Sequence, residues 1–315
     1  NAIKSKRIIE LTSNEAGIVF RKDKTFLLDW MQVYMEAQES AGKKDGSQIK
    51  IAMRILKDYA GEMVTLDQID GDFCRGYITY LLTEYHPKGK DISNYTLHNY
   101  YRALNGALNS AVRKKKMKAN PFNELEKSEK IRKPESMRSY MTIEEVQALI
   151  DTPMPHEEYE IVKCAYLFSC FCGLRISDII KLKWNDVFVD RGQYRLAVSM
   201  KKTKEPIYLP LSPEALKWMP ERGGKSSEDN VFDLPSANTI RMQLKPWAKA
   251  AGISKRFSYH TSRHTFATMM LTLGADLYTV SKLLGHADVK MTQVYAKIIN
   301  KKKDEAVNLV NGLFH

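Results

Sequence analysis

The feature that most constrains the fold is a break in the helical pattern of apolar residues, at residues 118–138. This stretch contains two prolines, a dense run of mixed charges and few apolar residues. Such a composition is typical of a connection between domains. In a chain of 315 residues it predicts two domains. The first follows a lead-in segment at residues 1–24 and occupies residues 25–117, and the second occupies residues 139–315.

The first domain is predicted to be entirely helical. Apolar side chains recur at three- and four-residue spacing in four segments. These segments begin at Phe26, after Ser47, near Phe73 and after Ser93. The spacing places Val33 on the apolar face of the first helix. A helical bundle is therefore expected between residues 25 and 117.

The second domain is predicted to be mostly helical with a small β-sheet. Thr142 precedes Glu145 by three residues, a capping box that starts a helix. An apolar helix is expected at residues 159–171. Residues 193–211 alternate between apolar and polar around a basic segment, which predicts two strands and a turn. The remainder of the domain has helical spacing, interrupted by glycines.

The charge of the chain predicts a polyanionic partner. Lys and Arg number 49 against 37 Asp and Glu, for a net charge of +12. Nucleic acid is the usual partner of so basic a protein, and an anionic membrane surface is the alternative. No predicted helix pairs a basic face with a strong apolar face, and no run of 18 apolar residues occurs, so a membrane is disfavoured. The cations Arg113, Lys114 and Lys115 end the last helix of the first domain, where they suit either a helix C-terminus or a phosphate.

The cysteines indicate a reducing compartment. Their spacing fits neither a redox pair nor a zinc ribbon, so we interpret them as free thiols, mostly buried. The N-terminus lacks the apolar core of a signal peptide, and a cytoplasmic location, the bacterial cytoplasm or nucleoid, is expected. The four residues are Cys74, Cys164, Cys170 and Cys172.

Two cations of the second domain are candidates for binding an anion. Arg175 follows the Gly173 break in an apolar context, so its charge needs a partner, which is either Asp178 or a bound anion. Lys202 lies in the basic turn of the predicted hairpin. A lysine in such a turn is more often simply solvated.

A second candidate group begins at His260. On a helix, His260 and Arg263 share a face because they are three residues apart. His260 and His264 have the spacing of a metal-binding pair, but acidic ligands are missing nearby and the zincin pattern is absent. We therefore expect no metal and no other cofactor.

Two further residues, His286 and Tyr295, are each unremarkable alone. A histidine at a helix end is more often a cap, and a tyrosine on an apolar face is more often part of the core. Together with two arginines, a lysine and another histidine, however, they make a set that can transfer a phosphoryl group without metal. The arginines neutralise the transition state, a tyrosine serves as nucleophile, and His and Lys move protons.

This set, in its order and spacing, resembles the active site of the tyrosine recombinase or phage integrase family. The motifs that carry the resemblance are Gly173-Leu-Arg175-Ile-Ser-Asp178, Lys202-Thr203, His260-Thr-Ser-Arg263-His264, Leu284-Gly285-His286 and Tyr295. The match covers residues 140–300, and the first domain resembles the family's core-binding, SAM-like domain less specifically.

The resemblance implies a role for each residue. Arg175 and Arg263 would hold the scissile phosphate, His286 would hydrogen-bond to it, and Tyr295 would form a 3′-phosphotyrosyl link. Lys202 would protonate the 5′-oxygen and His260 would exchange a proton with the tyrosine. Supporting and DNA-contacting roles would fall to Asp178, His264, Lys201 and Lys204.

The resemblance also implies an assembly. The two domains would form a C-shaped clamp on double-stranded DNA, and a homotetramer would act on two duplexes, in some systems with accessory DNA-bending proteins. Residues 304–314 have the spacing of a short amphipathic helix. That helix either packs on its own domain or, as in the family, inserts into a neighbouring subunit.

Two other functions compete with recombination in an integrase of a mobile element. A type IB topoisomerase uses similar residues, but the nine-residue spacing from His286 to Tyr295 and the compact size favour a recombinase. A catalytically idle DNA-binding regulator is disfavoured by the intact Arg175, Arg263 and Tyr295. The DNA target and the direction of recombination are not encoded in these motifs.

Overall fold

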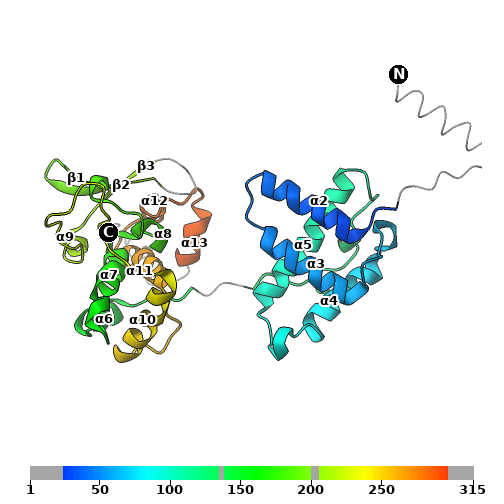
Figure 1. Ribbon diagram of the computed structural model, residues 1–315, viewed down its shortest axis with the longest axis horizontal. Helices are drawn as coiled ribbons and strands as arrows, with labels where there is room; N and C mark the ends of the chain where they lie inside the picture. Colours follow the sequence, from blue (N-terminus) through cyan, green and yellow to red (C-terminus); the bar gives the residue numbers. More distant parts are fainter. Residues whose placement is uncertain (1–23, 135–137, 200–205, 297–315) are drawn as a thin grey trace, which may run out of the picture. The chain divides into compact units, whose positions relative to one another are not determined.

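The computed structural model describes residues 24–134, 138–199 and 206–296. The chain divides into two compact units, residues 1–136 and 137–315. Figure 1 shows the elements of each unit. The predicted lead-in, the basic turn and the predicted C-terminal helix fall largely or wholly outside the described residues.

The described part of the first unit is helical, as the sequence predicts. Trp30 on α2 donates its indole N–H to the carbonyl of Ala107 on α5 at 2.8 Å, which ties these two helices together. The hydroxyl of Ser93 accepts the amide of Thr96 at 3.3 Å and starts α5. The α-helices are α2 (Leu27–Ser40), α3 (Gly46–Ala60), α4 (Gly71–Thr83) and α5 (Asn94–Arg113).

The expected position of Val33 was wrong, because its side chain is 53% exposed. The buried residues of α2 include Leu27, Trp30, Met31 and Met35. They form one stripe at helical spacing. Val33 lies two residues from Met31 and Met35, which turns it to the opposite side of the helix.

Residues 118–134, which were expected to be a linker, pack on the first unit. Phe122 is 1% exposed, Leu125 3% and Ile131 8%, and all three join the core of the four helices. The amide of Asn120 donates to Asn105 Oδ1 at 2.7 Å and so fastens the segment to α5. Charged residues outnumber the three core residues in this stretch. Its composition alone therefore indicates a linker.

The second unit is mixed α/β. It begins with the predicted capping box: the Thr142 amide donates to Glu145 Oε2 at 2.7 Å, and the Glu145 amide donates to Thr142 Oγ1 at 3.2 Å. The described helices are α6 (Ile143–Asp151), α7 (Glu160–Cys172), α8 (Ile176–Ile179), α9 (Pro213–Leu216), α10 (Ala237–Ala250), α11 (Tyr259–Thr272), α12 (Leu277–Leu283) and α13 (Lys290–Ala296).

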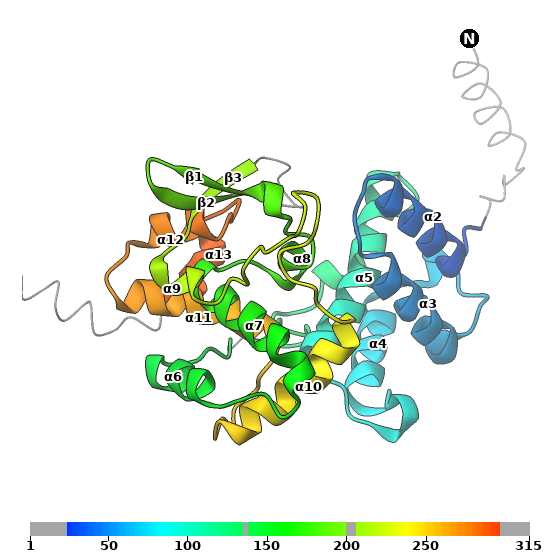
Figure 2. The ribbon, with the colours of Figure 1, turned by 60° about the vertical axis from the view of Figure 1, so that its left-hand side comes forward.

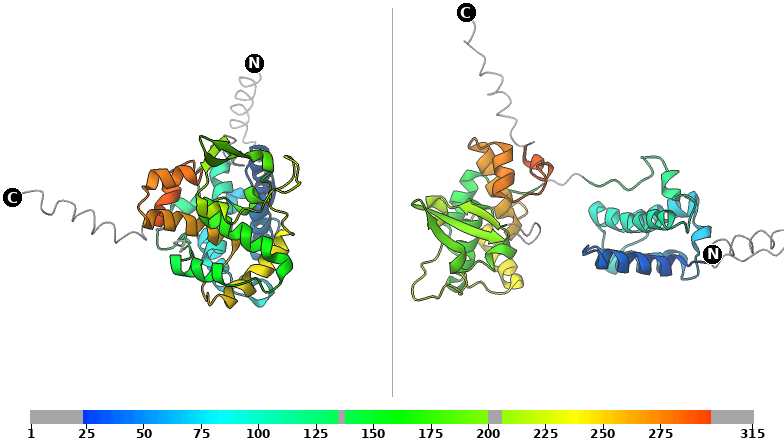
Figure 3. Two further views of the ribbon diagram at one scale, coloured as in Figure 1. Left: turned by 90° about the vertical axis from the view of Figure 1, so that its left-hand side faces the viewer. Right: turned by 90° about the horizontal axis from the view of Figure 1, so that it is seen from above.

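Three antiparallel strands form the sheet of this unit: β1 (Val187–Asp190), β2 (Gln193–Ser199) and β3 (Pro206–Pro210), in that order. Leu196 pairs with Leu209, and both are buried. The sheet lies at one end of the unit, with α6 and α10 at the other (Figures 1 and 2). The view from above in Figure 3 shows the strands as one layer. The predicted strand pair is therefore present, and β1 adds a third strand.

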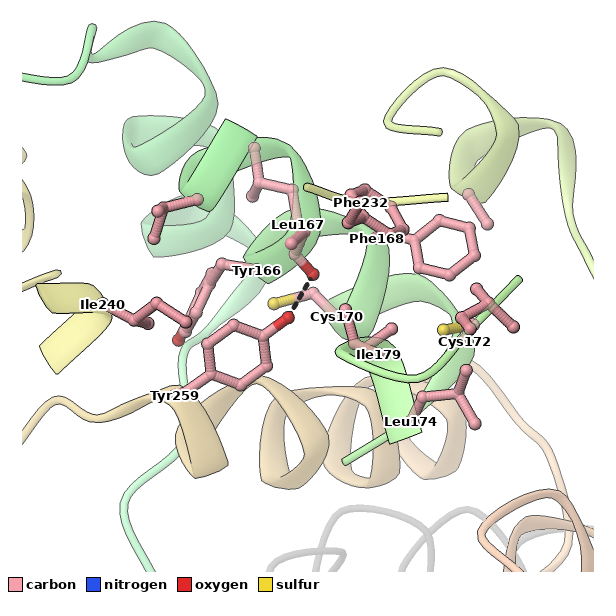
Figure 4. Close-up of a cluster of buried hydrophobic side chains, with 14 of the residues drawn as sticks. Tyr166, Leu167, Phe168, Cys170, Cys172, Leu174, Ile179, Phe232, Ile240 and Tyr259 are labelled. Carbon is pink, nitrogen blue, oxygen red and sulfur yellow. Dashed lines mark hydrogen bonds between the residues drawn. The ribbon is translucent and has the colours of Figure 1, made fainter. Parts of the chain in front are cut away.

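The centre of the unit is the contact between α7 and α11. Figure 4 shows Tyr259 of α11 pointing toward Tyr166 and Cys170 of α7. The Tyr259 hydroxyl donates to the Ala165 carbonyl at 2.7 Å, so the phenol is satisfied in an apolar site. Thr265 and Thr268 of α11 are buried too, and their hydroxyls donate to carbonyls of the same helix. Hydroxyl side chains satisfied in this way allow α11 to carry polar catalytic motifs through the core.

Candidate active site

A glycine turn places the first motif against α11. Gly173 ends α7 with a φ of +74°, a conformation that favours glycine. A Cβ at this position would lie 2.5 Å from Cδ1 of Phe266 on α11 and 3.1 Å from Leu284. The turn therefore packs closer to α11 than any other residue type allows. It directs the chain into Arg175, which immediately precedes α8.

Arg263 joins three of the motifs. It is 2% exposed, and its two terminal nitrogens donate to the carbonyl of Gly173 at 2.7 Å and to that of Leu284 at 2.5 Å. Burial, and then the charge of Arg175, lower the pKa of Arg263 to about 10. The guanidinium therefore remains charged at neutral pH, held between the turn after α7 and the end of α12.

Arg175 is partly exposed beside a buried carboxylate. Its side chain is 27% exposed, against 6% for Asp178, and its Nη1 lies 4.0 Å from Asp178 Oδ2. Ser177 donates its hydroxyl to the other carboxylate oxygen at 3.2 Å. Both alternatives that the sequence left open are compatible with this geometry. Asp178 orients Arg175, whose exposed part faces solvent and can meet an anion.

Tyr295 is buried on α13, with its hydroxyl bonded to a histidine. Its side chain is 2% exposed and packs with Phe266 and Leu284, since α13 contacts both α11 and α12. The hydroxyl lies 2.5 Å from Nδ1 of His264. The sequence assigned His264 a supporting role, whereas in the structure it contacts the phenol oxygen directly.

The protonation of this pair follows from its surroundings. Burial, and then the charges of His260 and the nearby arginines, lower the pKa of His264 to about 3. Burial raises the pKa of Tyr295, and the charges of Arg138, Arg263 and Arg175 oppose that rise. At neutral pH both groups of this hydrogen-bonded pair are therefore uncharged.

The other two histidines lie around this pair. The ring of His260, exposed on α11, is 4.5 Å from that of His264 between centroids. Partial desolvation, and then the charges of Arg263 and two further arginines, lower the pKa of His260. The His260 ring is therefore neutral at neutral pH. Nδ1 of His286 lies 2.7 Å from Oγ1 of the fully buried Thr292. That contact fixes the ring of His286 between α12 and α13.

Comparison with known proteins identifies this arrangement. Residues 139–302 match the phage integrase family, and residues 26–132 match the phage integrase SAM-like domain. The chain belongs to the phage integrase family of tyrosine recombinases. Its members are site-specific DNA recombinases, and this is the enzyme class of the chain. That membership favours a recombinase over a type IB topoisomerase.

Bacterial tyrosine recombinases are similar to this chain. A tyrosine recombinase of Pseudothermotoga lettingae is 29% identical over 242 residues, 70% of the chain and 82% of the relative. Tyrosine recombinase XerD of Vibrio vulnificus is 32% identical over 184 residues, 54% of the chain. That match spans 59% of the XerD protein, less than two thirds of its length.

Solved structures share the fold. The Tn1549 transposon integrase in complex with circular intermediate DNA has a TM-score of 0.68 at 17% identity, over 86% of this chain and 94% of that one. A lambda integrase dimer bound to a COC′ core site has a TM-score of 0.63 at 21% identity, over 86% and 95% of the two chains. The predicted fold, mostly α with a small sheet, is confirmed.

The structure places one residue beside Tyr295 of this recombinase that our sequence-based prediction did not include in the site. The guanidinium carbon of Arg138 lies 5.9 Å from the centre of the Tyr295 ring. We assigned Arg138 to the end of the linker, because a lone arginine in a charged stretch gives no signal of a site. Only the folding of this segment onto α11 brings it to the tyrosine.

The remaining predicted residues lie outside the described residues or on the first unit. Lys201, Lys202 and Lys204 lie outside the described residues, between Ser199 and Pro206, which pair as the ends of β2 and β3. At the end of α5 the predicted DNA-contacting cations Arg113, Lys114 and Lys115 are all exposed.

The described residues give two further findings. They contain no group of three or more His, Cys, Asp and Glu side chains placed to hold a metal ion. Among the same residues, no helix has the length and apolar character needed to span a membrane.

Proposed function

We propose that Tyr295 is the nucleophile of this recombinase and forms a 3′-phosphotyrosyl bond with the cleaved DNA strand. The observation that carries the proposal is the position of its hydroxyl, which is buried next to His264 and under the charge of Arg175 and Arg263. A core tyrosine of purely structural function has no need of two arginines from two other motifs.

The two arginines bind the scissile phosphate in this mechanism. Arg263 is rigid, because two backbone carbonyls hold it, and Arg175 presents an exposed edge oriented by Asp178. Preorganised cations of this kind stabilise the charge that develops on the phosphoryl oxygens, the work that Mg²⁺ does in other phosphoryl transferases. His286, fixed by Thr292, donates a further hydrogen bond to the phosphate.

Cleavage proceeds by exchange of one phosphate ester for another. The Tyr295 oxygen attacks phosphorus, the phosphorus–O5′ bond breaks, and Lys202 donates a proton to the departing O5′. The phenol proton passes to His260, which is neutral at physiological pH and can accept it. Since the hydroxyl contacts His264 in the structure, it must first turn toward His260. Rejoining runs the same steps in reverse with a new 5′-hydroxyl.

We expect the DNA partner to be double-stranded and to contact both units. The net charge of +12 and the exposed Arg113, Lys114 and Lys115 at the end of α5 support DNA binding by the first unit. Lys201 and Lys204 extend the contact from the β2–β3 turn. A relative of the same fold, lambda integrase, is known as a tetramer bound to a Holliday junction, which supports a homotetramer on two duplexes here.

The biological reaction that fits best is integration or excision of a mobile element. Similarity to the Tn1549 transposon integrase over 94% of that chain supports this assignment. Inversion and dimer resolution are the alternative reactions of a site-specific recombinase. Accessory DNA-bending proteins belong to the proposed integration reaction.

The direct test is to trap and sequence covalently bound DNA. The full chain is incubated with a library of nicked duplexes, denatured, and recovered with the DNA that remains attached. We expect Tyr295→Phe to form no covalent adduct while DNA binding is retained. Tyr278→Phe, at an exposed tyrosine of α12, is the matched control and should react normally. A normal adduct yield from Tyr295→Phe would refute the assignment.

A further inference from the structure

The segment that precedes α6 is fastened to the catalytic helix. The hydroxyl of Ser139 donates to the carbonyl of Arg256 at 2.6 Å, and the amide of Met141 donates to the hydroxyl of Thr265 on α11 at 2.9 Å. Met141 and Thr265 are both buried. Arg138 stands immediately before these two anchors, so its backbone is held beside α11 by contacts that do not involve its own side chain.

The anchored segment brings the Arg138 side chain to the phenol of Tyr295. Its guanidinium carbon lies 5.9 Å from the ring centre, within the range of a cation–π contact. The two residues differ sharply in exposure, because Arg138 is exposed and Tyr295 is 2% exposed. The tyrosine therefore has His264 on its buried side and a solvent-facing arginine on the other.

We propose that Arg138 is a further catalytic residue, which stabilises the Tyr295 phenolate when the bond to phosphorus forms or breaks. The proposal rests on Tyr295 being the nucleophile. In cleavage Arg138 favours loss of the phenol proton, and in rejoining it favours departure of the phenolate from phosphorus. Its charge is available at any physiological pH, because a guanidinium does not lose its proton there.

The electrostatics of the site distinguish Arg138 from its neighbours. Burial raises the pKa of Tyr295; the charge of Arg138 is the largest influence that lowers it, ahead of Arg263, and a hydrogen bond from Arg138 adds to the effect. Because a hydrogen bond to the charged form favours that form, Arg138 stabilises the phenolate as the proton leaves.

His264 cannot replace Arg138 by accepting the proton. Its pKa is lowered to about 3, whereas that of Tyr295 is raised above the ordinary tyrosine value, so proton transfer between them is strongly disfavoured. The other ionisable groups that influence the phenol or His264 come from the Arg175 motif, from α11 and from the turn between α12 and α13. They are Arg175, Arg263, His260 and His286.

The first measurement is the pKa of this one tyrosine in the folded protein. The chain has 16 tyrosines, so a fluorinated tyrosine acidic enough to ionise near neutral pH is placed at position 295 and titrated by ¹⁹F NMR. Arg138→Gln keeps the size of the side chain and removes its charge. Loss of one charged hydrogen-bond donor should raise the pKa of the fluorinated Tyr295 by about 1 unit. An unchanged titration in Arg138→Gln would overturn the proposal.

The second measurement is single-turnover cleavage with saturating nicked DNA and the natural tyrosine. We expect Arg138→Gln to cleave roughly tenfold more slowly at neutral pH, since one pKa unit corresponds to that factor. Arg138→Lys, which keeps the charge, should recover most of the rate. With the fluorinated tyrosine, at a pH above its titration in both proteins so that the nucleophile is already ionised, the defect of Arg138→Gln should largely disappear. A defect of equal size with both nucleophiles indicates a structural effect and overturns the proposal.

Two controls separate the possible failures. Lys282→Gln removes a cation 5.2 Å from the ring of exposed Tyr278 and should alter neither the titration nor the rate. Tyr295→Phe tests the proposed function itself. If Tyr295→Phe still forms an adduct, the nucleophile assignment fails. If it does not, and Arg138→Gln cleaves at the normal rate, only the role of Arg138 fails.

Discussion

Substitution of Gly173 by alanine should separate backbone strain from steric clash at the active site. The residue has a φ of +74°, and an added Cβ would approach Phe266 Cδ1 to 2.5 Å and Cε1 to 2.9 Å. The left-handed conformation costs an alanine about 1 kcal/mol. Both ring atoms belong to a rigid, buried side chain, so the clash adds about 2 kcal/mol, as overpacking of a core does. We expect Gly173→Ala to destabilise the catalytic unit by about 3 kcal/mol.

Gly252 provides a matched control. It has the same φ of +74° after α10, but a Cβ there would meet nothing within 4 Å. Gly252→Ala should therefore lose only about 1 kcal/mol, from the conformation alone. In a domain of this size, 1 kcal/mol corresponds to roughly 2–4 °C of melting temperature. The catalytic unit of Gly173→Ala should melt about 6–12 °C below the wild type, and that of Gly252→Ala about 2–4 °C below.

The assay is thermal unfolding of the full chain, followed by single-turnover cleavage below the melting range. Because the Gly173 carbonyl accepts from Arg263, displacement of the turn should also move that guanidinium. Cleavage by Gly173→Ala should fall by at least tenfold, with DNA binding changed much less. Equal melting temperatures for Gly173→Ala and Gly252→Ala would refute the steric reasoning, and normal cleavage by Gly173→Ala would refute the link to Arg263.

Three other predictions follow from the proposed mechanism. Cleavage should proceed in EDTA, because arginines stand where a metal ion would act; a strict Mg²⁺ requirement in the cleavage step itself would contradict this. DNA affinity should fall steeply with salt, because each phosphate contact contributes roughly 0.9 to the slope of the logarithm of the binding constant against the logarithm of the salt concentration. Replacing Lys114 and Lys115 with Gln should make that slope shallower. If the double variant keeps the full slope in such titrations, the end of α5 does not contact DNA. Deletion of residues 304–315 should leave a folded protein that binds one DNA site but forms no tetramer with two duplexes, because this segment is expected to insert into a neighbouring subunit. Tetramers of the truncated protein in light scattering would contradict that insertion.

The sequence alone determined the parts of this recombinase that depend on local chemistry. The capping box at Thr142 and Glu145, the end of α7 at Gly173 and the helix start after Ser93 are set by residues within four positions of one another. The order of the motifs in the second domain likewise indicated phosphoryl transfer, because only a few side-chain types can neutralise a phosphate and attack it.

The tertiary structure decided which of these residues meet. Residues 118–134 join the first core through Phe122 and Leu125, and neither their charge nor their prolines predicts that contact. The phenol oxygen of Tyr295 contacts His264 rather than His260, because the position of α13 relative to α11 selects one of two histidines a single turn apart. Arg138 reaches the same phenol only through anchors to α11 and to Arg256, more than 100 residues away in sequence. Such long-range contacts depend on the packing of whole elements, and no local pattern in the sequence records them.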